Sequence, residues 1–140
     1  MKVEVVTEAS GIPVGVATDA ASVPETVLAG AALADVPPSV PVPTGVPVVA
    51  DRGYDSDPLR AFLEGEGFTL VAAHRRGRKR KKTADGRRLR RLKRRWKVER
   101  SFAWLHSYRR VVTRYERRMD LYDGFVHLAL AFMALNRLVK

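Results

Sequence analysis

The chain contains no cysteine, which excludes disulfide bonds and cysteine-based zinc sites. Long apolar runs are also missing. The longest, residues 124–135, is shorter than the roughly 18 residues that a membrane-spanning helix needs, and His127 interrupts it. The amino terminus lacks the basic and then apolar pattern of a signal peptide. We therefore expect a soluble protein of the cytoplasm, with a single domain in residues 1–140.

Acidic residues are scarce in one part of the chain. Residues 74–118 contain 21 lysines and arginines and three acidic residues. Residues 1–73 contain three lysines and arginines and ten acidic residues. This segregation accounts for the net charge of +11. An acidic or near-neutral body with one dense cationic segment predicts contact with nucleic-acid phosphates. An anionic membrane surface attracts such segments too, and is the competing partner at this point.

The first half of the chain alternates strand and helix patterns. Apolar and polar side chains alternate in a way that predicts a β-hairpin over residues 2–18. The apolar run of residues 46–50, which ends in Asp51, and a second run predict strands over residues 46–51 and 68–73 that are buried on both faces. A helix between them is expected to begin after Asp55 or Ser56, either of which can cap it. These patterns indicate an α/β fold.

The second half is basic and then helical. Residues 74–95 have almost no apolar periodicity, so we predict a solvated basic loop that leads into a helix. Residues 95–118 are expected to form a helical region, and residues 119–139 a long amphipathic terminal helix. The apolar residues of this last helix recur at alternate spacings of four and three, at Leu121, Phe125, Leu128, Phe132, Leu135 and Val139.

Two carboxylates stand where metal chemistry is possible. Asp51 ends a predicted strand, and ligands of open α/β sheets bind beyond the carboxyl ends of the strands. Glu99 is the only acid between Asp85 and Glu116 and is expected at the edge of the core. Position alone favours ordinary roles, because Asp51 can open a turn and Glu99 can pair with Arg95 one helical turn before it.

Taken together, the two carboxylates and the cationic segment suggest phosphoryl transfer. Hard oxygen ligands suit Mg²⁺ or Mn²⁺. Two such ions can activate an attacking oxygen and stabilise a leaving one. The sequence offers no nucleophile elbow and no glycine-rich phosphate loop, and its three histidines are far apart.

Longer blocks resemble a known family. "ADRGYDSDPLR" (residues 50–60) and "RRWKVERSFAWLHSYRRVVTRYERR" (residues 94–118) are similar to the two most characteristic blocks of DDE insertion-sequence transposases. The segments "SGIPVGVATDA" and "GFVHLALAFMALNRL" are also similar, so the resemblance covers nearly the whole chain. It implies a ribonuclease-H-like mixed sheet with flanking helices. Asp51 then matches the second catalytic Asp, Glu99 the catalytic Glu, and Arg95 the arginine that assists it.

The resemblance also implies an activity and its partners. Transposases of this family cleave and join DNA at the ends of insertion sequences, so the partners are terminal repeats and target DNA rather than a membrane. Asp51 and Glu99 are then the ligands of Mg²⁺ or Mn²⁺. Together with the charge pattern, it predicts DNA contacts at Arg75, Arg76, Arg78, Lys79, Arg80, Lys81, Lys82, Arg87, Arg88, Arg94, Lys97, His106, Arg109 and Arg110.

The chain departs from the family pattern in three places. Leu92 stands where a tyrosine is common, and His106 where a lysine is frequent. The first catalytic Asp and the central strand that carries it have no counterpart. Asp19 cannot replace that Asp, because it would lie roughly 10 Å from the position needed.

We therefore expect a C-terminal transposase fragment that is inactive alone, or that needs a separate N-terminal portion or further copies of itself. The alternatives are a non-catalytic DNA-binding remnant and, more weakly, a structural RNA-binding protein.

Overall fold

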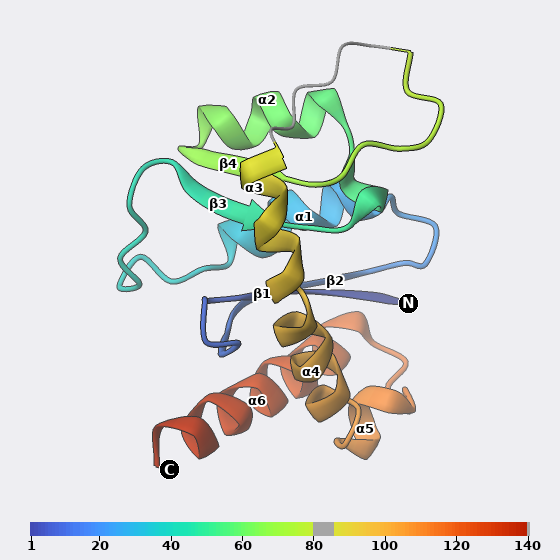
Figure 1. Ribbon diagram of the computed structural model, residues 1–140. Helices are drawn as coiled ribbons and strands as arrows, with labels where there is room; N and C mark the ends of the chain where they lie inside the picture. Colours follow the sequence, from blue (N-terminus) through green and yellow to red (C-terminus); the bar gives the residue numbers. More distant parts are fainter. Residues whose placement is uncertain (80–85, 140) are drawn as a thin grey trace.

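The computed structural model describes residues 1–79 and 86–139. It has an α/β architecture in which two small sheets are flanked by helices (Figure 1). No helix in the described part of the chain is both long and apolar enough to cross a membrane. In chain order the elements are β1 Lys2–Thr7, β2 Pro13–Asp19, α1 Glu25–Ala34, β3 Val46–Val49, the 3-10 helix η1 Arg52–Tyr54, α2 Asp57–Gly65, β4 Phe68–Val71, α3 Gly86–Leu89, the 3-10 helix η2 Arg90–Arg94, α4 Trp96–Leu105, α5 Arg109–Val112 and α6 Met119–Leu138.

The first sheet is the predicted hairpin. β1 pairs antiparallel with β2, and Val5 lies opposite Val16. Both valines are buried in a core that α6 also lines. The neighbouring Gly15 faces the other side, where a Cβ atom would lie 2.3 Å from the carbonyl oxygen of Ala32. A glycine at this position therefore lets α1 pack directly on β2.

The second sheet consists of β3 and β4, which are parallel. α2 connects them and begins as predicted, with the Ser56 hydroxyl accepting the backbone N–H of Leu59 at 3.4 Å. The prediction that both strands are buried on both faces is wrong for β3, which is half-buried throughout. β3 pairs with β4 alone among the described residues, so its other edge stays accessible.

The two sheets are not joined by a strand ladder in the described part of the chain. A side-chain contact links them instead. The Tyr54 hydroxyl donates to the Glu4 carboxylate, with distances of 2.7 and 2.9 Å to its two oxygens. Glu4 lies on β1 and Tyr54 follows β3, so this bond joins the hairpin to the end of the second sheet.

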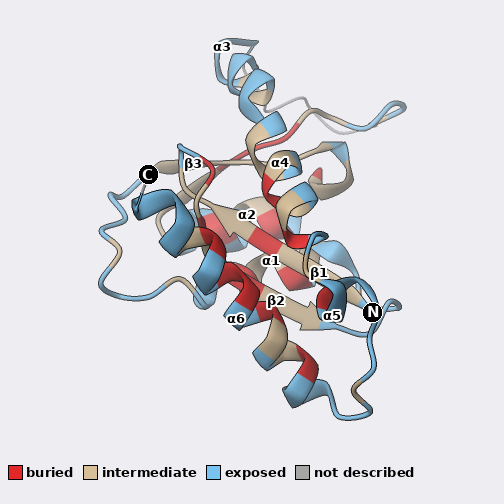
Figure 2. Cartoon of the chain, turned by 90° about the horizontal axis from the view of Figure 1, so that it is seen from below, coloured by how far each residue is buried: buried red, intermediate tan, exposed pale blue. Residues whose placement is uncertain are grey.

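The terminal helix is confirmed as α6, but it buries a different face from the predicted one. Leu121, Leu128, Phe132 and Leu135 are about half exposed. The buried residues are Tyr122, Val126, Ala129, Leu130 and Met133. They pack against the hairpin valines and α4, and Figure 2 shows this buried side turned toward β1 and β2. The helix has apolar residues on both faces, so its neighbours select the buried one.

Of the predicted basic loop over residues 74–95, the described residues 74–79 are a loop and residues 86–94 are not. Gly86–Leu89 and Arg90–Arg94 are helical, because arginine and leucine favour helix and neither proline nor glycine interrupts residues 87–94. The predicted helical region 95–118 is also interrupted. α4 ends at Leu105, where the Ser107 hydroxyl donates to the Trp104 carbonyl at 2.6 Å, and residues 113–118 are not helical.

Candidate active site

Asp51 lies just beyond β3, as predicted. Its Oδ1 accepts the backbone N–H of Gly53 at 2.6 Å and so caps the short helix η1. A Cβ atom on Gly53 would lie 2.8 Å from this same oxygen, which explains the glycine. Asp51 therefore does open a turn. Because it is only half-buried, its second carboxylate oxygen has room for a further ligand.

A cavity of about 290 Å³ brings Asp51 next to Arg95. Its walls come from the residues that follow β3 and β4, from η2 and from the residue between η2 and α4, namely Ala50, Asp51, Arg52, Ala73, Leu92 and Arg95. The position agrees with the rule that ligands bind beyond the carboxyl ends of parallel strands. Residues that are far apart in the sequence thus meet at one opening.

Glu99 is connected to this cavity through Arg95. The Arg95 guanidinium donates to Glu99 Oε1 at 3.0 and 3.2 Å, one helical turn apart. Glu99 does not line the cavity, and its side chain is 59% exposed, so the expectation that it sits at the core edge is wrong. α4 turns Ser101 and Leu105 inward instead, which leaves Glu99 on the outer side. Such an exposed pair contributes at most about 1 kcal/mol to stability.

The hairpin turn holds α4 in place. The buried Ser101 hydroxyl donates to the Gly11 carbonyl at 2.7 Å, and Arg100 donates to the Ser10 carbonyl at 3.0 Å. Lys97 donates to the Ala9 carbonyl. These bonds orient the helix that carries Glu99. The role of Ser101 was not predicted, and its only signal is a polar residue on an otherwise apolar helix face.

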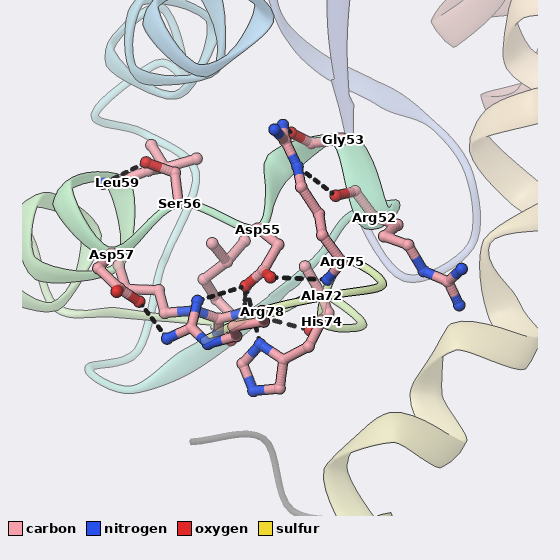
Figure 3. A network of polar contacts seen from close by, with 12 residues as sticks. Arg52, Gly53, Asp55, Ser56, Asp57, Leu59, Ala72, His74, Arg75 and Arg78 are labelled. Atoms are coloured by element: carbon pink, nitrogen blue, oxygen red, sulfur yellow. Dashed lines mark hydrogen bonds and ion pairs between the residues drawn. The ribbon is translucent and has the colours of Figure 1, made fainter. Parts of the chain in front are cut away.

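Asp55 is the centre of a second polar cluster. Its side chain is only 2% exposed. It accepts Arg60 Nη2 at 3.0 Å and the Arg75 backbone N–H at 2.8 Å, and it pairs with His74 Nδ1 at 2.9 Å and Arg78 Nη1 at 3.3 Å (Figure 3). Burial alone would raise the pKa of Asp55. The hydrogen bonds from Arg75, Arg60 and His74 outweigh it and hold that pKa well below its usual range.

The Glu4 carboxylate on β1 is influenced by the charge of Asp51. Burial raises the pKa of Glu4, the negative charges of Glu25 and Asp51 add to the rise, and the Tyr54 hydrogen bond opposes it. The acids around the end of β3 therefore repel one another. Added positive charge at this place would be favourable.

The described residues do not complete a metal site. No three His, Cys, Asp or Glu side chains within residues 1–79 and 86–139 lie close enough together to hold an ion. Asp51 and Glu99 are donors of the right chemistry for Mg²⁺ or Mn²⁺, but they are two where the resemblance implies three.

The predicted DNA-contacting residues fall into three groups. Arg80, Lys81 and Lys82 lie outside the described residues. Four others have contacts inside the fold, namely Arg75, Arg78, Lys97 and Arg110, the last paired with Glu116 at 2.7 Å. The rest are exposed at the surface, namely Arg76, Lys79, Arg87, Arg88, Arg94, His106 and Arg109. DNA contact at these residues stays a prediction.

Comparison with known proteins identifies the family of the chain. Residues 1–137 match the family described as the transposase DDE domain. A Burkholderia cepacia protein named as transposase for insertion sequence element IS402 is 35% identical over 152 residues, which cover 98% of this chain and 64% of that protein. A Brucella ovis protein named as transposase for insertion sequence element IS6501 is 37% identical over 90 residues, which cover 64% of this chain and 67% of that protein.

No solved structure matches the chain. The chain spans just under two thirds of the length of the Burkholderia relative. Because the family match extends over nearly all of its residues, the chain belongs to the DDE transposases of insertion sequences.

Proposed function

We propose that this chain forms part of the catalytic domain of a transposase that cleaves DNA and transfers its strands at insertion-sequence ends. The observation that carries the proposal is the cavity at the ends of β3 and β4. Asp51 and Arg95 both line this cavity, and Arg95 binds Glu99. These are the positions at which the family resemblance implies the second catalytic Asp, the assisting Arg and the catalytic Glu.

The chain's own residues have separable roles in this proposal. Asp51 and Glu99 would hold Mg²⁺ or Mn²⁺, which supplies a Lewis acid for phosphoryl transfer when bound. Arg95 orients the Glu99 carboxylate through its two hydrogen bonds. The contacts of α4 with the hairpin turn keep both residues in position. We derive no step through the metal, because the described residues do not complete its site.

We infer that the domain is ribonuclease-H-like and that a further strand pairs between β1 and β3. Each of these strands has a partner on one edge only in the described part of the chain. The Tyr54–Glu4 hydrogen bond holds the two sheets to each other while these edges stay unpaired. A strand there would merge the sheets into one mixed sheet. An Asp at its end would provide the missing carboxylate.

The alternative is a non-catalytic DNA-binding remnant. The observation in its favour is the same lack of a third carboxylate near Asp51 and Glu99 among the described residues. Under this alternative the cationic segment would still bind DNA, but adding an N-terminal portion would not produce cleavage.

One experiment separates the two. Labelled element ends are incubated with Mg²⁺ and the chain, alone or together with the N-terminal third of a full-length relative. We expect cleavage only when both parts are present, and its loss on Asp51→Asn or Glu99→Gln. Glu64→Gln, on the exposed side of α2, is the matched control and should change nothing. Absence of cleavage under all conditions would support the remnant.

A further inference from the structure

The cationic segment is divided into two parts that differ in their contacts. In the first part, residues 74–79, two arginine side chains contact residues that follow Asp51. Arg78 donates to both Asp55 and Asp57, and its side chain is only 11% exposed. The Arg75 guanidinium donates to the Arg52 carbonyl at 3.4 Å and to the Gly53 carbonyl. These two arginines already have partners within the fold (Figure 3).

The second part is helical and exposed. We call Gly86–Leu89 and Arg90–Arg94 together the arm. Figure 2 shows α3, where the arm begins, standing away from the rest of the described chain. Arg87 takes part in an interaction of its own. The other cations of the arm make no ion pair or side-chain hydrogen bond with any described residue; they are Arg88, Arg90, Arg91, Lys93 and Arg94. The nearest following acid, Glu99, is paired with Arg95.

Paired and unpaired cations differ in the free-energy cost of contacting a DNA phosphate. An exposed cation without a partner can contact a phosphate at the cost of side-chain freedom alone, and the contact releases counterions from the DNA. A guanidinium bound to a buried carboxylate must first leave that carboxylate less compensated, which is unfavourable. The cations of the arm are therefore available to DNA, whereas Arg78 is held by Asp55 and Asp57.

We propose that the arm binds the phosphate backbone of duplex DNA, while Asp55 is a positioning residue that keeps the Arg78 guanidinium inside the fold. The proposal rests on the proposed function, because it assigns the DNA contact of that same site. It separates Arg78, which is held by carboxylates of the fold, from the exposed cations of the arm.

The arm is tested by removing equal kinds of charge from each part. Binding of a labelled duplex is followed by fluorescence anisotropy between 50 and 200 mM salt, a range in which such binding weakens steeply. Replacing Arg90, Arg91 and Lys93 by Gln should reduce the log–log salt slope by roughly 2.7, or about 0.9 for each cation. Replacing Arg78 by Gln should leave the slope unchanged, because its guanidinium is already paired with Asp55 and Asp57. Equal losses per charge in both variants would overturn the assignment.

The role of Asp55 is tested by Asp55→Asn. Removing the negative charge should release Arg78, so the salt slope should become steeper by up to about 0.9. Asp55→Glu, which retains the charge, should restore the original slope. A residue that only supported the fold would weaken binding or leave it unaltered, and either result would contradict a positioning role.

A second variant covers the case in which Asp55→Asn does not fold. Asp57→Asn removes one partner of Arg78 at a less buried position and should steepen the slope by at most about 0.9. An unchanged slope in this folded variant would count against the proposal. If the unaltered chain shows no salt-dependent DNA binding at all, the proposed function fails. If the chain binds DNA but the arm substitutions leave the salt slope unchanged, only the assignment of the arm fails.

Discussion

Val126→Ala should destabilise the protein more than Leu128→Ala, although leucine loses the larger group. Val126 is 0% exposed and lies between α6 and the hairpin, whereas Leu128 is 51% exposed on the opposite side of the helix. Removing two buried carbons from Val126 costs about 1.6 kcal/mol in lost burial and somewhat more for the cavity that remains. The better helix propensity of alanine offsets about half a kcal/mol of this loss in stability. The net loss should be about 2 kcal/mol.

Leu128→Ala loses three carbons, of which about half the surface is already in water, and leaves no closed cavity. Its cost should be at most about 1 kcal/mol. Urea denaturation followed by circular dichroism measures both values. With a slope of roughly 1–2 kcal/mol per molar urea, Val126→Ala should lower the midpoint by about 1–2 M and Leu128→Ala by half of that or less. The reverse order would mean that the repeat of Leu121 and Leu128 is the packed face, and would refute the observed orientation of α6.

Three further changes test single contacts. The pKa of Asp55 is lower in the folded protein, so its stabilising effect should be full above about pH 4 and disappear as the pH falls further; unfolding free energies from pH 6 to 2.5 should show a smaller acid loss in Asp55→Asn than in the unaltered chain. Gly15→Ala should cost more than about 2 kcal/mol in a thermal melt because its Cβ meets a backbone carbonyl, whereas Gly124→Ala, in open space on α6, should stabilise by up to about 1 kcal/mol; equal effects would contradict the close approach of α1. Ser101→Ala removes a buried hydrogen bond to the hairpin turn and should cost about 1–2 kcal/mol in urea denaturation, together with faster amide exchange in residues 8–11; unaltered exchange would show that α4 is held by other contacts.

Local features of the candidate site could be predicted well. Asp51 follows an apolar run, and such runs end as strands wherever a turn residue and glycine come next. Ser56 stands before a proline and an amphipathic segment, so the start of α2 is a matter of capping. The Arg95–Glu99 pair needs only a helix, because residues four apart share a face.

The contacts between distant residues could not be predicted in this way. Asp55 accepts a hydrogen bond from the backbone N–H of Arg75, which is 20 residues away in the sequence. Ser101 donates one to the Gly11 carbonyl, which is 90 residues away. Neither spacing has a local period from which a contact follows. A serine on an apolar helix face and an aspartate after a strand each fit several roles until the surrounding elements are in place.

From local sequence alone one could predict the family resemblance, the hairpin, the start of α2, the span of α6, and the separation of an acidic body from a cationic segment. Propensity, capping and periodicity are properties of neighbouring residues, so the chain carries them without its fold. Only the tertiary structure decided which face of α6 is buried, because both faces are apolar and the hairpin selects one. The tertiary structure also decided which arginines are held by Asp55 and which stay exposed. Charge is the same along the segment, but a buried carboxylate stands at one end of it only.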